Sequence, residues 1–231
     1  MHENKRVEIL NNRKKNKMRN YINVKNEIDY NKLRKPAEII KNGGIVIFPT
    51  ETVYGIGTNG FDLDAIEKLY KLKERNYNKP ISLLVSDIDM VNLVAKDITD
   101  LEYKIMEKFF PGPLTIILRK RDNVPSILTA NKDTIGIRIP SGEIVKKLIE
   151  YAGCPIATSS ANISGESSNT NIKNLLQDFK EQVDYFIDGG ESEIGVASTV
   201  LQVIDGVPVI LREGSISKKE IITSIENIIK K

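Results

Sequence analysis

Histidine and cysteine are almost absent from the sequence, which contains one of each and no tryptophan. The single Cys154 excludes an internal disulfide and a cysteine-cluster metal site, and this fits a reducing cytoplasm. The single His2 lies near the start of the chain, so a catalytic triad and a histidine-ligated zinc inside the fold are excluded. Any chemistry must therefore use Lys, Arg, Ser, Thr and carboxylate groups, which are the groups that handle phosphate.

Long hydrophobic runs are also missing. No apolar stretch approaches the roughly 20 residues that span a bilayer, and the start of the chain has no apolar segment of the secretory-signal type. We therefore expect a cytoplasmic protein with no membrane contact. The length of 231 residues suits one large domain, or one domain with an appendage.

The positive charge is concentrated at the start of the chain. Residues 1–20 contain seven Lys/Arg and two Glu, a net charge of +5, whereas the whole chain carries +3, which leaves about −2 for the remainder. The remainder is therefore not a basic nucleic-acid binder by overall charge. We predict a basic, disordered extension over 1–20 and a single domain over 21–231. A weak contact between RNA and the extension stays open.

Helical and strand patterns mostly alternate along the chain. Strands are expected at 21–28, 45–48, 81–85, 114–118, 134–140, 153–157, 183–187, 198–204 and 207–211. Helices are expected to start at Asp29, Asp62, residues 87 and 100, Ser141, Thr170 and Ser217. Asp205-Gly206 predicts a two-residue hairpin. This order predicts an α/β fold with a mixed parallel and antiparallel sheet.

The stretch from Gly43 to Gly57 has the most unusual composition. The apolar run Ile45–Phe48 reads as a buried strand, and it is followed by Thr50, Glu51 and Thr52 and then by two glycines. Small hydroxyl groups at the carboxyl end of a buried strand, beside glycines, indicate a ligand crevice. A polar strand end followed by a glycine turn is the alternative.

Two further strand ends are rich in hydroxyl groups, and two arginines lie in apolar strands. The polar clusters are Thr158–Asn162 and Ser198–Thr199, and the arginines are Arg138 and Arg212. Burying Arg138 would cost several kcal/mol without an anionic partner. These groups predict a pocket for a small polar ligand that carries a carboxylate. The alternative is an arginine that pairs with a nearby acid or lies on an outer face.

A third feature is the basic segment Lys73–Pro80, which contains Lys73, Arg75 and Lys79. An arginine fork with two lysines could bind a polyphosphate, although such a segment is more often a solvated surface. The sequence contains neither the GxxxxGK[ST] phosphate loop nor a GxGxxG segment after a strand.

Six segments then occur in a fixed order: PTETVYGIG, KLKERNYNKPISLLV, FFPGPLTIIL, TIGIRIP, ATSSANISG and GVASTV…ILREG. In this order and spacing the chain resembles the YrdC-type threonylcarbamoyl-AMP synthases over about residues 22–220. Because it stops soon after ILREG, it resembles their short single-domain form.

The resemblance implies an open, twisted mixed sheet flanked by helices and an L-threonylcarbamoyladenylate synthase activity, a nucleotidyl transfer. ATP, L-threonine and bicarbonate would give threonylcarbamoyl-AMP and pyrophosphate. Mg²⁺ is expected with ATP, and no organic cofactor is expected. The product would pass to the tRNA threonylcarbamoyl transferase machinery for modification of the adenosine beside the anticodon.

The resemblance also implies roles for particular residues. The family's KxR and SxN signatures match Lys73 and Arg75, expected as catalytic, and Ser160 and Asn162. The residues expected to bind ATP are Arg75, Lys79, Thr134, Ser160, Asn162, Ser168 and Arg212. Those expected to bind L-threonine are Thr52, Arg138, Thr158 and Ser198.

Three alternatives remain at the level of the sequence. An RNA-binding module would use the basic segments, but it would not explain the buried hydroxyl clusters. A paralogue of the same fold without activity is also compatible with the motifs. A carbamoyl-adenylate-forming domain of hydrogenase maturation would be accompanied by acylphosphatase and zinc-finger segments, and the chain has neither.

Overall fold

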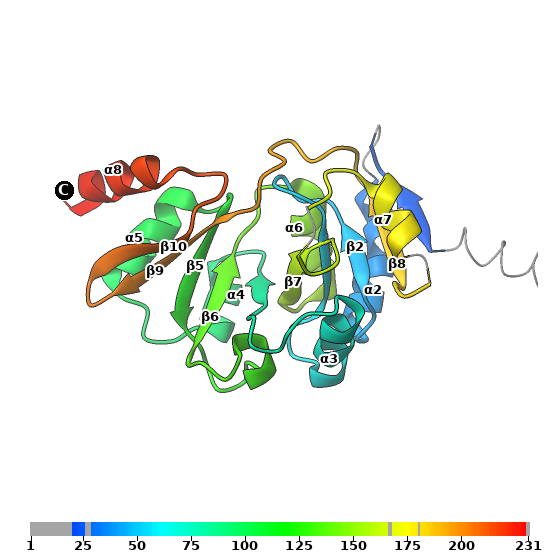
Figure 1. Cartoon of the computed structure of the whole chain (residues 1–231), viewed down its shortest axis with the longest axis horizontal. Helices are drawn as coiled ribbons and strands as arrows, with labels where there is room; N and C mark the ends of the chain where they lie inside the picture. The colour runs from blue at the N-terminus through cyan, green and yellow to red at the C-terminus, as the bar shows by residue number, and fades with distance from the viewer. Residues whose placement is uncertain (1–19, 26–28, 166–167, 180, 230–231) are drawn as a thin grey trace, which may run out of the picture.

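The computed structural model describes residues 20–25, 29–165, 168–179 and 181–229. Its strands are β1 Tyr21–Asn23, β2 Val46–Phe48, β3 Gly55–Asn59, β4 Ser82–Leu84, β5 Leu114–Arg119, β6 Thr134–Arg138, β7 Ile156–Ser160, β8 Tyr185–Asp188, β9 Thr199–Ile204 and β10 Val207–Arg212. The described strands form one open, ten-stranded sheet in the order β1-β8-β2-β3-β7-β4-β6-β5-β9-β10 (Figure 1). Neighbours β4 and β6 are parallel, and β3 and β7 are antiparallel. The predicted mixed sheet is confirmed.

Helices cover both faces of this sheet. They are η1 Tyr30–Leu33, α2 Arg34–Lys41, α3 Leu63–Leu72, α4 Ile88–Val94, α5 Asp100–Phe109, η2 Ser126–Thr129, α6 Glu143–Ala152, α7 Ile172–Asp178 and α8 Lys218–Ile229. One apolar cluster joins α2 and α6 to β2 and β8. A larger cluster joins α3, α5, α7 and α8 to the opposite face. Among the described residues, no helix is long and apolar enough to cross a membrane.

Most predicted helix starts are confirmed. Asp62 caps α3 by accepting a hydrogen bond from the Ala65 N–H, and Ser217 accepts one from the Glu220 N–H before α8. Asp29 caps the short helix η1, and α2 follows it. The predicted cap at Thr170 is wrong by one residue, because Asn171 caps α7.

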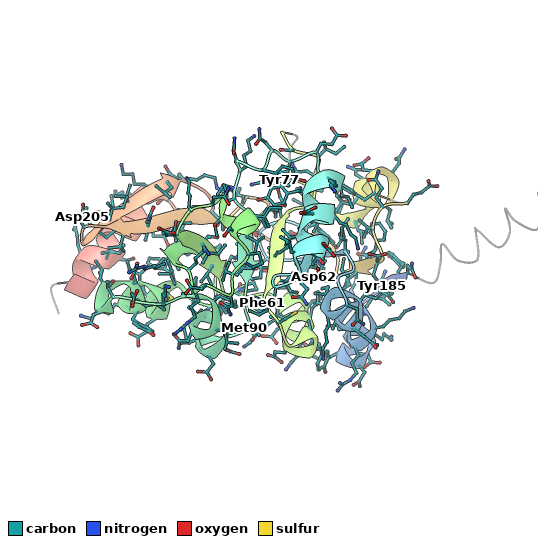
Figure 2. The ribbon with its side chains drawn as sticks, turned by 90° about the horizontal axis from the view of Figure 1, so that it is seen from below. Phe61, Asp62, Tyr77, Met90, Tyr185 and Asp205 are labelled. Carbon is teal, nitrogen blue, oxygen red and sulfur yellow. The ribbon has the colours of Figure 1, made fainter. Side chains whose placement is uncertain are left out.

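The hairpin of β9 and β10 is also confirmed. Its turn residues Asp205 and Gly206 have left-handed φ angles of 50° and 77°. Figure 2 shows Asp205 at the tip of the hairpin, at the opposite end of the molecule from Tyr185 in β8. The predicted disordered extension and the end of the first predicted strand, at residues 1–19 and 26–28, lie outside the described residues.

The strand β3 was not predicted. Its glycines allow close packing within the sheet, and Gly55 also lines the cavity described below. A Cβ on Gly57 would lie 2.7 Å from Cγ2 of Ile156, and one on Gly55 would lie 2.8 Å from Cε2 of Phe48. Only glycine lets β3 lie this close to its neighbours, so β3 continues the sheet directly after the Thr50–Val53 turn.

Candidate active site

A cavity of about 560 Å³ lies on one face of the sheet, above β7, β4, β6, β5 and β9. Alternate residues of a strand share one face of the sheet. On the face below the cavity, several of these residues are small. Ser82 of β4, Gly136 of β6 and Thr115 of β5 all contribute to the lining. The cavity therefore covers part of one face of the sheet. Thr50, Thr52 and Gly55 also line it, so the crevice predicted from the stretch Gly43 to Gly57 is confirmed.

Arg138 is buried at the end of β6 and has an anionic partner inside the protein. Its Nη2 lies 2.7 Å from Oε1 of Glu51, and the two side chains are only 7% and 6% exposed. Its Nε donates to the Gly112 carbonyl, and its Nη1 donates to the Thr52 hydroxyl. Glu51 is thus the buried counter-charge that Arg138 requires. No role for Glu51 was predicted from the sequence.

Glu51 is held in place by the segment that leads into α6. Its Oε1 accepts a hydrogen bond from the Ser141 N–H at 3.0 Å. Burial by itself would raise the pKa of Glu51, but the charge of Arg138 and the Ser141 hydrogen bond together lower it. Glu51 is therefore ionised at neutral pH, and the pair with Arg138 has no net charge.

The hydroxyl of Thr52 can only accept a hydrogen bond from a ligand. Thr50 donates its own proton to the Val53 carbonyl, so in the 2.9 Å contact between the Thr50 and Thr52 hydroxyls Thr52 is the donor. Thr52 also accepts from Arg138 at 3.0 Å. One lone pair remains, which suits an N–H or O–H group of a ligand.

Ser198 faces the same cavity from the start of β9. Its hydroxyl lies 2.8 Å from that of Thr115, and Arg212 donates to its carbonyl at 2.7 Å. Partial burial, and then the charges of Arg75 and Arg138, lower the pKa of Arg212. The three arginines are therefore close enough for their positive charges to act on one another.

Arg75 supplies a further cation to the lining. Its Nε donates to the Lys79 carbonyl and its Nη2 to the Pro80 carbonyl. Nearby, Tyr77 stacks on Tyr70 of α3 with ring centroids 4.9 Å apart. The segment after α3 is thus folded back onto the helix, and this places Arg75 at the cavity.

The described lining residues carry four cations and no carboxylate. The cations are Arg75, Lys132, Arg138 and Arg212, and only Arg138 is paired with an acid, which lies outside the lining. Such a site favours a strongly anionic ligand.

Lys73, at the C-terminus of α3, lies outside the lining of the cavity and is only 1% exposed. Its Nζ donates to the carbonyls of Ser160 and Asn162, each at 2.5 Å. Burial and the charge of Arg75 lower its pKa to about 7. A neutral amine still has two N–H groups for these two carbonyls, so Lys73 can hold the turn after β7 in either protonation state.

This pKa predicts how the Lys73→Met variant differs from the wild type. Between pH 7 and the ordinary lysine pKa, the unfolded chain binds a proton that the folded chain has lost, so stability rises with pH. The free energy of unfolding of the wild type, relative to Lys73→Met, should rise by about 2 kcal/mol between pH 7 and pH 9. Urea unfolding at the two pH values measures this difference, and an unchanged difference would mean that Lys73 stays charged.

The family model Sua5_yciO_yrdC, described as telomere recombination, matches residues 38–214. The chain belongs to the Sua5/YciO/YrdC family. It is 40% identical over 200 residues to the threonylcarbamoyl-AMP synthase of Pyrococcus abyssi, covering 87% of this chain and 59% of that protein. It is 40% identical over 194 residues to a putative threonylcarbamoyl-AMP synthase of Methanocaldococcus jannaschii, covering 82% and 91%.

Solved structures of Sua5/YciO/YrdC proteins have the same fold. The structure of P. abyssi Sua5 complexed with L-threonine matches with a TM-score of 0.86 and 40% identity, covering 89% of this chain and 60% of that one. E. coli YciO matches with a TM-score of 0.78 and 26% identity, covering 87% and 97%. The chain thus spans about three fifths of the length of the P. abyssi protein.

Within this Sua5/YciO/YrdC domain, the cavity brings together most of the residues predicted from the sequence. Those in its lining are Thr52, Arg75, Thr134, Arg138, Thr158, Ser160, Ser198 and Arg212. Those outside it are Lys73, Lys79, Asn162 and Ser168. Asn162 supports the lining indirectly, because its Oδ1 accepts a hydrogen bond from the Ser160 hydroxyl.

Lys132 and Thr115 also line the cavity, although neither is among the site residues predicted from the sequence. Thr115 lies within the segment FFPGPLTIIL, where a hydroxyl in an apolar strand was an available signal. Lys132 follows two residues with left-handed backbone, Ala130 and Asn131, in a turn that matches no motif. No signal in the sequence identified it.

Proposed function

We propose that this chain is an L-threonylcarbamoyladenylate synthase, which transfers the adenylyl group of ATP to N-carboxy-threonine. The observation that carries the proposal is that one cavity holds two groups of residues with different chemistry. We assign Thr52, Arg138 and Ser198 to the amino acid and call them the amino-acid end. We assign Arg75, Lys132 and Arg212 to ATP and call them the nucleotide end; all six line the cavity, and the two ends meet where Arg212 donates to the Ser198 carbonyl. The names of the P. abyssi and M. jannaschii relatives support the same activity.

The amino-acid end suits L-threonine. The guanidinium of Arg138 would bind the carboxylate, and Thr52, which can only accept, would receive a hydrogen bond from the amine or the hydroxyl. The amine of threonine, once it has lost a proton, combines with bicarbonate to give the carbamate and water. A solved structure of P. abyssi Sua5 is a complex with L-threonine, which supports threonine as the ligand.

The nucleotide end suits the triphosphate of ATP. A carbamate oxygen would attack the α-phosphorus in line, form the new P–O bond and expel pyrophosphate. Catalysis of this step depends on positioning and on stabilising charge, and Arg75, Lys132 and Arg212 can supply positive charge. Thr134 and Ser160 add hydroxyl groups to the same lining. The labile product would then pass to the machinery that modifies tRNA.

The Mg²⁺ expected with ATP would be held mainly by the nucleotide. Protein-held Mg²⁺ usually has one or two carboxylate ligands beside the phosphates, and the described lining residues include none. No group of three or more His, Cys, Asp or Glu residues that could hold a metal ion occurs within the described part of the chain. We therefore assign no protein ligand to this ion.

The test is the release of pyrophosphate from ATP in the presence of L-threonine and bicarbonate. Release is expected only when all three substrates are present, so each is omitted in turn. Mass spectrometry should detect threonylcarbamoyl-AMP in the complete mixture. Release that continues without threonine would contradict the proposal.

The Thr52→Ala variant tests the amino-acid end. Removal of one hydrogen bond to the substrate is expected to raise the KM for threonine by roughly tenfold and to leave the KM for ATP nearly unchanged. Thr223→Ala, at an exposed position of α8, is the matched control and should behave like the wild type. Equal effects on the two KM values would mean that Thr52 does not face threonine.

A further inference from the structure

The two ends of the cavity carry different net charge. At the amino-acid end, Arg138 is neutralised by Glu51 at 2.7 Å. At the nucleotide end, Arg75 and Arg212 donate to carbonyl oxygens, and Arg212 also donates to the Ser198 hydroxyl; all of these acceptors are uncharged. No carboxylate among the described lining residues balances these cations. Arg138 is therefore neutralised by an acid and Arg75 and Arg212 are not, although Arg212 also reaches Ser198 of the amino-acid end.

Glu51 is fixed so that its charge remains beside Arg138. Its Oε1 serves both Arg138 and the Ser141 N–H, and Gly142, the residue before α6, lies against it. A helix N-terminus favours a negative charge. Its Oε2 is buried and has no hydrogen-bond partner. Keeping a buried carboxylate half satisfied is costly for stability, which points to a role in the site.

We propose that Glu51 determines which kind of ligand the amino-acid end accepts. By neutralising Arg138, it favours the binding of free threonine, a zwitterion, over the binding of plain anions, including the phosphate chain of the nucleotide. A zwitterion brings a carboxylate to Arg138 and an ammonium group into the field of Glu51. A plain anion is attracted by Arg138 but repelled by Glu51. The identity of the two ends rests on the proposed function.

A matched pair of ligands tests this role. L-threonine and (R)-3-hydroxybutyrate, which has hydrogen in place of the ammonium group, are titrated by calorimetry into the wild type and Glu51→Gln without ATP. The wild type should prefer threonine. In Glu51→Gln this preference should fall by roughly tenfold or more, mainly through tighter binding of hydroxybutyrate. An unchanged preference in the folded variant, or a wild type that does not prefer threonine, would overturn the proposal.

Glu51→Asp is the conservative variant. It keeps the negative charge on a shorter side chain, so the preference for threonine should stay close to that of the wild type. A preference that falls equally in Glu51→Asp and Glu51→Gln would assign the effect to shape and would overturn the role of charge. Thermal unfolding of each variant, with and without threonine, confirms that the measurements are made on folded protein.

Competition by pyrophosphate gives a second measurement that needs no variant. Pyrophosphate should bind the nucleotide end of the wild type without displacing threonine, and displacement would overturn the proposal even if Glu51→Gln failed to fold. Neither titration requires turnover. Pyrophosphate release that is independent of threonine would therefore contradict the proposed function, whereas an altered preference in Glu51→Gln would still support the role of Glu51.

Discussion

Replacing Arg138 by methionine is expected to lower the free energy of unfolding by about 3–5 kcal/mol, because it leaves the carboxylate of Glu51 buried without its partner. The same change removes the donors to the Gly112 carbonyl and the Thr52 hydroxyl. Threonine binding should be lost as well. Urea unfolding measures the first effect, and titration with threonine measures the second.

The double variant Arg138→Met/Glu51→Met separates these two effects. With both charges removed, most of the lost stability should return, because a buried ion pair contributes little compared with apolar residues of similar volume. Threonine binding should remain absent. If the two substitutions instead destabilise the protein additively, the two side chains are not energetically coupled, and the ion pair at 2.7 Å does not explain the stability of this region.

Local patterns in the sequence were sufficient for most of the fold. Side-chain caps such as Asp62 and the Asp205-Gly206 turn act within a few residues, so the pattern of the chain reveals them. The strand β3 was missed because Gly55 and Gly57 disfavour a strand locally. Phe48 and Ile156 on neighbouring strands leave no room for a side chain at these two positions. This contact depends on how the strands pair in the folded protein, which local sequence patterns do not reveal.

For the site, the sequence identified which types of residue take part better than it identified which side chains reach the cavity. Of the three cations expected in the segment Lys73–Pro80, Arg75 lines the cavity and Lys79 does not. Lys73 is buried and donates to two carbonyls. The sequence also indicated that buried Arg138 needs an anion, and it did not reveal that Glu51 supplies it. Glu51 and Arg138 are far apart in the chain and meet only because of the order of the strands in the sheet, which local sequence patterns do not reveal.

Arg75→Ala is expected to lower kcat/KM for ATP by about 100-fold, which corresponds to the loss of charge-assisted hydrogen bonds to phosphate. Arg75 lines the cavity, whereas the nearby Lys79 is exposed and lies outside the lining. Lys79→Ala is therefore the matched control and should change kcat/KM by no more than a few-fold. Pyrophosphate release measures both variants.

Arg75→Lys then separates charge from geometry. Lysine keeps the positive charge, but it cannot donate from two sides to the carbonyls of Lys79 and Pro80 while facing the phosphates. Only partial recovery of kcat/KM is expected. Full recovery would reduce the role of Arg75 to its charge, and wild-type activity in Arg75→Ala would remove it from the nucleotide end, leaving Lys132 and Arg212 as the cations that bind the triphosphate.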